Sequence, residues 1–219
     1  MSDAWTLDLS ERFEAAMTLA GVSAVVKPDN LLLSLVTAVP RMLSGLLPPA
    51  AQPVAGPLLD ALDALLGRVS VTVPVPGTDP AIVLSLASQA DPVTASCTLL
   101  HERTHADQTR RVGGAQAAAD YTSVELRAQR EADGAAASLW LRHALTGELP
   151  ADPPPLSSLY HLDADGQRLA AGVLASHLAT VRAGCVPPIA ACLDAARWLR
   201  ASPVVPESIK ARVPAFVVT

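Results

Sequence analysis

The chain has 219 residues, of which 50% are hydrophobic, 17% are charged and only 3% are aromatic. This length suffices for one substantial domain, and the apolar content stays far from that of a membrane protein. A net charge of −5 with so few rings for base stacking argues against nucleic acid as a main partner. The acidic N-terminus lacks the features of a signal peptide, and no apolar run is long enough to span a membrane. The expected location is therefore cytoplasmic, with export without a cleavable signal left open.

In chain order, the pattern predicts helices at about residues 10–20, with Ser10 as the N-cap, and at 29–47 and 56–66. Residues 69–75 and 81–86 are rich in β-branched and apolar side chains, which predicts a hairpin around a turn at 76–80. Pro74 indicates that the first strand lies at an edge, because proline cannot donate to a ladder. Further helices are expected at four positions and a short one after Pro206; the four are 91–112, 120–145, 165–182 and 188–200.

The predicted fold class is therefore mainly α with a small β-hairpin or sheet (α+β). Three segments are expected: an N-terminal helical segment (1–67), a core with the hairpin and two central helices (68–149), and a C-terminal helical segment (150–219). Together they are expected to form one compact domain.

Five residues of the helix predicted at 91–112 carry the chemistry: the sequence from His101 to His105 reads H-E-x-x-H. On a helix, positions i and i+4 lie on one face, so both histidines can reach one metal ion. Glu102 follows His101 and lies next to it around the helix, where it can contact a water bound to that metal. The pattern is typical of zinc-dependent hydrolases, most often peptidases.

The first residues favour a helix start, with Asp91 as the N-cap and Pro92 at the first helical position. No helix-breaking residue follows before Gly113. At about 100° per residue both histidines point inward, in mid-helix. The opposite face carries three charged residues and is expected to be solvated: Arg103, Asp107 and Arg110. Two stacked core histidines beside a surface glutamate are the alternative, but unpaired buried imidazoles are costly.

A hydrolytic zinc site keeps three protein ligands, and Glu125 is the favoured third. It lies twenty residues after His105, and it shares a helical stripe with small and apolar residues that could pack on the motif helix: Ala128, Gln129, Ala132, Ala136, Leu139 and Trp140. Glu131 is the alternative third ligand. It lies about 120° away beside Arg127, Ser138 and Arg142, a face expected to be solvated.

Residues 91–145 resemble the gluzincins, the thermolysin-like clan of zinc peptidases, in which H-E-x-x-H on one helix is completed by a Glu on the next. The resemblance implies Zn²⁺ as cofactor, a peptide or protein as substrate, and Glu102 as general base. Gln129 and Asp133 are candidates to orient a histidine ligand. The oxyanion donor, a Tyr or His in that clan, would be Tyr121, Tyr160 or His161.

The predicted function is a zinc metallopeptidase. Two alternatives share its residues: a zincin-like module that binds a partner without turnover, and a zinc hydrolase of a non-peptide amide. The hairpin before the motif helix either simply covers the core or offers an edge strand to an extended peptide.

Overall fold

The computed structural model of the protein describes residues 4–19, 24–26, 70–73, 80–85, 91–156 and 162–214. The helices predicted at 29–47 and 56–66 lie outside these ranges, as do Pro74, most of the predicted turn, Tyr160 and His161. Within the described ranges, no helix is long and apolar enough to cross a membrane.

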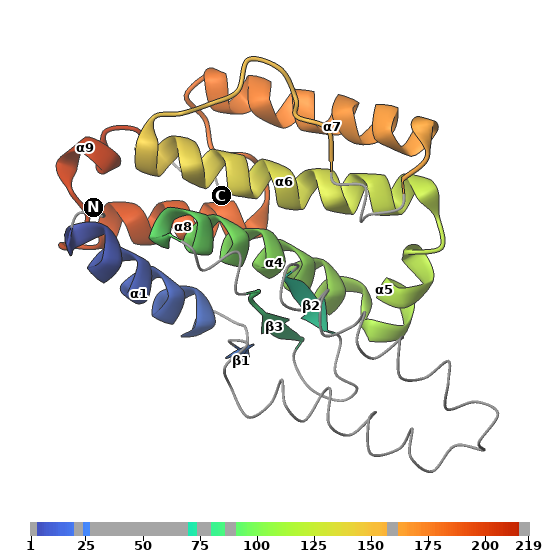
Figure 1. Ribbon diagram of the computed structural model, residues 1–219, viewed down its shortest axis with the longest axis horizontal. Coiled ribbons are helices and arrows are strands. Elements are labelled where there is room, and N and C mark those ends of the chain that lie inside the picture. Colours follow the sequence, from blue (N-terminus) through green and yellow to red (C-terminus); the bar gives the residue numbers. More distant parts are fainter. Residues whose placement is uncertain are drawn as a thin grey trace, which may run out of the picture.

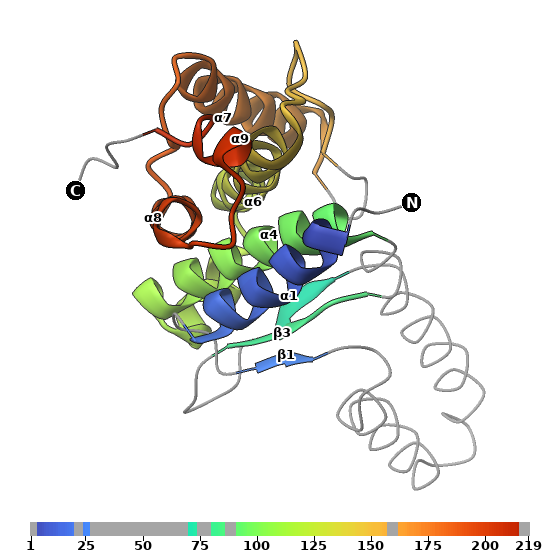
Figure 2. The same ribbon diagram turned by 90° about the vertical axis from the view of Figure 1, so that its left-hand side faces the viewer.

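Helices dominate the described part of the chain, and a small sheet accompanies them (Figures 1 and 2). This arrangement confirms the predicted fold class. The helices are α1 (Ala4–Leu19), α4 (Pro92–Val112), α5 (Gly114–Asp120), α6 (Val124–Thr146), α7 (Ala164–Arg182), α8 (Ala190–Ala201) and α9 (Glu207–Lys210); the strands are β1 (Ala24–Val26), β2 (Val71–Val73) and β3 (Ala81–Val83).

The sheet has the order β1-β3-β2. Strands β2 and β3 pair antiparallel, with Thr72 opposite Ile82, which confirms the predicted hairpin strands. Strand β1 pairs parallel with β3 and was not predicted, because three residues carry too little alternation to mark a strand. β2 therefore lies at one edge of the sheet among the described strands.

The two central helices begin and end as their residue types favour. Asp91 caps α4, accepting a hydrogen bond from the Thr94 amide at 2.9 Å, and Gly113 ends the helix with φ 82°. Ser123 caps α6, which is preceded by the short helix α5. In the layered view of Figure 2, α6 lies between α4 and α7, and the sheet lies on the other side of α4. Alanines at many buried positions of α6 let these helices pack closely.

Helix α1 begins earlier than predicted, at Ala4, so Ser10 is an interior residue of the helix and not its N-cap. The Ser10 hydroxyl is buried, 3.2 Å from the Pro92 carbonyl oxygen and 3.1 Å from the Ser96 hydroxyl. Ser10 thus ties α1 to the first turns of α4.

The face of α4 that was expected to be solvated is covered, and this prediction was wrong. Arg103 is only 2% exposed. Its guanidinium donates to the Met17 carbonyl at 2.9 Å, to Asp107 at 3.2 Å and to Asp194 at 3.2 Å. Helices α1 and α8, distant in sequence, pack on this face and supply Met17 and Asp194, while Asp107 belongs to α4 itself. The buried Arg103 charge is therefore paired.

Arg103 and Arg197 both bond Asp194, but replacing them should change the free energy of unfolding by different amounts. Arg103→Met removes one donor from the buried Met17 carbonyl and one from Asp107, which keeps its bond to Arg110. The variant should therefore lower the free energy of unfolding by about 2–4 kcal/mol. Arg197, with a side chain 53% exposed, also bonds Asp194, and Arg197→Met should cost less than about 1 kcal/mol. Urea unfolding of both variants tests this, and equal losses would contradict it.

Candidate metal centre

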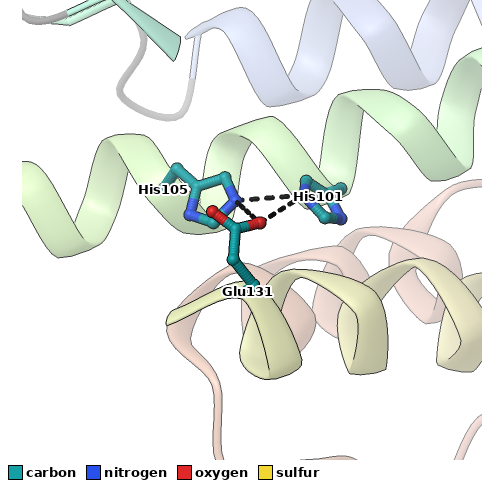
Figure 3. A group of neighbouring side chains, drawn as sticks. All are labelled: His101, His105 and Glu131. Atoms are coloured by element: carbon teal, nitrogen blue, oxygen red, sulfur yellow. Dashed lines mark hydrogen bonds and ion pairs between the residues drawn. The ribbon is translucent and has the colours of Figure 1, made fainter. Parts of the chain in front are cut away.

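Helix α4 places the two motif histidines side by side in its middle, as the spacing predicts. Their Nε2 atoms lie 3.0 Å apart, and the rings meet edge to face with centroids 4.7 Å apart. His105 is buried at 7% exposure, and the His101 side chain is 12% exposed. Both rings point toward α6 (Figure 3).

Glu131 of α6 meets them from the opposite side. Figure 3 shows its carboxylate directed at the two rings, with Oε2 3.4 Å from Nε2 of His105 and 3.8 Å from Nε2 of His101. This Oε2 atom is buried and accepts no hydrogen bond in the structure. Three ligand atoms, one each from His101, His105 and Glu131, thus lie within 4.8 Å of one another and could hold a metal ion.

The spacing of these atoms suits a small tetrahedral cation. Ligand atoms about 2.0–2.1 Å from a tetrahedral zinc stand roughly 3.3 Å from each other, and the separations between these three atoms are 3.0, 3.4 and 3.8 Å. Two imidazoles and one carboxylate form a donor set that zinc accepts. The buried oxygen of Glu131 without a hydrogen bond is the kind of atom that a cation would satisfy.

The electrostatics of the site favour positive charge at the same point. Burial acts to lower the pKa of His105, but the Glu131 and Glu102 carboxylates outweigh it and raise this pKa to about 9. Burial likewise acts to raise the pKa of Glu131, yet the two imidazoles bring it down to about 2. The carboxylate is therefore ionised, and it draws either a proton or a cation to the imidazoles.

The structure does not bring Glu125, the favoured third ligand, to the histidines, and the choice is corrected to Glu131. Glu125 is exposed in the first turn of α6, where its Oε2 accepts a hydrogen bond from Ser123 at 2.9 Å. The apolar stripe that was expected to face the motif helix does not bring Glu125 to it. Asp133, which shares a face with Ala136 and Trp140, contacts both Gln108 of α4 and His177 of α7. Periodicity identified buried faces but not the helix that covers each one.

Glu102, the predicted general base, is buried at 5% exposure beside the sheet. The Thr72 hydroxyl on β2 lies 2.9 Å from Oε2 of Glu102 and 2.8 Å from its main-chain oxygen. Because both oxygens are acceptors, the hydroxyl donates and its hydrogen is shared between them. Thr72 thereby holds one carboxylate oxygen and leaves Oε1 to other partners.

The other predicted site residues within the described ranges lie at different distances from the candidate centre. The Tyr121 hydroxyl donates to Oε1 of Glu131 at 3.3 Å, so this side chain reaches the candidate centre. Asp133 accepts from Gln108 at 3.2 Å, and Gln108 in turn contacts His105, so Asp133 reaches the centre through one intermediate. Gln129 is exposed and makes no contact with either histidine among the described hydrogen bonds.

Two residues of the centre were missed from sequence. Oε1 of Gln108 lies 3.0 Å from Nδ1 of His105; its position three residues after His105, on the inward face, was a usable signal. Gly134 lies against the His101 ring, so close that a Cβ built there would stand 2.9–3.0 Å from three ring atoms. Its role depends on the approach of two helices, which sequence spacing does not reveal.

Comparison of the chain with protein-family models, with curated proteins and with solved structures found no match in any of the three. The function is therefore inferred from the H-E-x-x-H motif and the geometry of the site.

The two glutamates of α6 make a direct test of the ligand set. Glu131→Gln removes the anionic ligand and should weaken zinc binding by about 10-fold or more. Glu125→Gln is the matched control in the same helix and should bind zinc as the wild type does. Competition with a chromophoric chelator measures both, and zinc loss confined to Glu125→Gln would contradict the geometry.

Gly134→Ala should have an effect opposite to the usual one for a helix interior. Replacing glycine by alanine there ordinarily favours a helix by about 1 kcal/mol, but this Cβ would push against the His101 ring. We expect weakened zinc binding in this variant. Gly172→Ala on α7 meets nothing within 4 Å, so it should keep zinc affinity and leave stability equal or higher. Thermal unfolding and chelator competition on the two variants check both statements.

Proposed function

We propose that the protein is a zinc-dependent metallopeptidase. The observation that carries the proposal is the convergence of His101, His105 and the buried Glu131 oxygen, with Glu102 beside them on the same helix. The protein would thus hold three zinc ligands, as a catalytic site does, and leave further coordination to water or substrate. When bound, zinc would lower the pKa of a water molecule toward neutrality and polarise the substrate carbonyl.

Glu102 is the proton carrier in this proposal. Its carboxylate lies near enough to act electrostatically on both His105 and Tyr121. It accepts a proton from the attacking water as the new C–O bond forms. It then gives that proton to the amine nitrogen as the C–N bond breaks, so that one carboxylate acts first as base and then as acid. The hydrogen bond from Thr72 fixes the orientation of the carboxylate while Oε1 does this work.

Tyr121 is the donor assigned to the oxyanion. Burial and the nearby Glu131 carboxylate raise the pKa of Tyr121 above its usual value, so the phenol keeps its proton at neutral pH. In this structure the hydroxyl donates its one hydrogen to Glu131; in the proposal it would turn that hydrogen to the carbonyl oxygen and stabilise the negative charge that develops there.

A peptide is the favoured substrate because of the strand beside Glu102. Among the described strands, β2 pairs on one side only, and its Thr72 touches Glu102. An extended peptide that added to this edge would bring its main chain next to the general base. This placement favours a peptide over other amides.

The variant Glu102→Gln tests the proposal. It keeps the shape of the side chain but cannot accept a proton, so peptide cleavage should fall by about 10²–10⁴-fold while zinc binding persists. The readouts are metal content and cleavage of a peptide library, with Glu125→Gln as a control that should retain both. Bound zinc without Glu102-dependent cleavage would overturn the peptidase and favour the partner-binding module. Absence of zinc from the wild type would overturn the metal centre itself.

A further inference from the structure

A chain of hydrogen bonds leads away from His105 on the side opposite to the metal ligands. Nδ1 of His105 lies 3.0 Å from Oε1 of Gln108, and Nε2 of Gln108 lies 3.2 Å from Oδ2 of Asp133. The other oxygen of Asp133, Oδ1, lies 2.9 Å from Nε2 of His177. Three helices contribute to this chain: α4, α6 and α7.

The chemistry of the Asp133 carboxylate sets the direction of every bond. A carboxylate only accepts, so Gln108 must turn its NH₂ group toward Asp133 and its carbonyl oxygen toward His105. That carbonyl also only accepts, so Nδ1 of His105 must carry a hydrogen. Nδ1 of His105 is thereby occupied, and Nε2, which faces His101 and Glu131, is the nitrogen available to a metal.

We propose that Gln108, Asp133 and His177 are positioning residues that fix the ring orientation and the metal-binding nitrogen of His105. His177 is the outer anchor: it holds one oxygen of Asp133, so that the other stays aligned with Gln108. The proposal deepens the proposed function, since it concerns the same metal centre, but it does not depend on peptide cleavage.

The surroundings explain why an outer anchor is needed. Gln108, Asp133 and His177 all line one cavity of about 440 Å³ between α4, α6, α7 and α8, whereas His101, His105 and Glu131 do not. Water in this cavity can compete for the Asp133 oxygens and for the Gln108 amide. A hydrogen bond from His177 restricts Asp133 to one orientation and so opposes that competition. In this way α7, which contributes no ligand, becomes part of the metal centre.

A double-mutant cycle on zinc affinity tests the relay. Gln108→Leu removes the direct partner of His105 and should weaken zinc binding about 10- to 100-fold. His177→Leu should weaken it by a smaller factor, and His177→Gln, which can still donate to Asp133, should restore most of the loss. In the Gln108→Leu background, His177→Leu should cause no further loss, because the link is already broken.

Ser176→Ala is the matched control, since Ser176 also lies on α7 and lines the same cavity. It should leave zinc affinity unchanged, and thermal unfolding of each variant confirms that it is folded. Additive losses from the Gln108 and His177 variants would overturn the relay, because they would show that α7 acts through packing alone.

A measurement on the metal-free protein separates failure of the relay from failure of the metal centre. In ¹⁵N-labelled wild-type protein, the Nδ1–H of His105 should give a slowly exchanging proton resonance. This resonance should broaden or vanish in Gln108→Leu and exchange faster in His177→Leu. A resonance equally protected in both variants would overturn the relay. If the wild type binds no zinc but the resonance behaves as expected, the proposed function fails and the relay stands.

Discussion

The close approach of α4 and α6 at Gly134 is the contact on which the candidate centre depends. The His101 ring lies against the α6 backbone at this residue, in space that any Cβ would fill. Glu131 stands almost one helical turn earlier, on nearly the same side of α6, so this approach also sets how near its carboxylate comes to the imidazoles. A larger residue at position 134 would hold the helices apart, and the three ligand atoms would separate.

The second constraint is electrostatic. The Nε2 atoms of His101 and His105 lie only 3.0 Å apart, so they cannot both direct lone pairs at each other without a positive charge between or beside them. The ionised Glu131 supplies only negative charge. A proton can meet this need in part, and the Glu131 and Glu102 carboxylates, which raise the pKa of His105 against the effect of burial, favour it. A divalent cation meets it more fully, because it satisfies both nitrogens and the buried Glu131 oxygen at once. The three side chains could therefore hold a cation, whichever chemistry follows.

The sequence predicted the local features of this protein well and its pairings of distant elements poorly. The bounds of α4, the hairpin strands and the inward histidines follow from caps, β-branched runs and 3.6-residue periodicity, all of which are local. The choice between Glu125 and Glu131, the burial of Arg103 and the role of Gly134 depend on which helix packs on which face. Because α6 is covered by both α4 and α7, its apolar stripe could not identify the neighbour of the metal ligands.

Contacts on two sides of helix α4 orient different residues of the H-E-x-x-H motif. On the sheet side, Thr72 of β2 donates a hydrogen bond to Glu102, the proposed proton carrier. On the α7 side, Gln108 contacts His105, a candidate metal ligand. The two contacts share no residue, so a change at the sheet should alter proton transfer without altering metal affinity, and a change at α7 should act in the first place on the metal. The proposed proton carrier, Glu102, thus lies between the two candidate metal ligands, His101 and His105, on one helix, and yet the two roles respond to different parts of the fold.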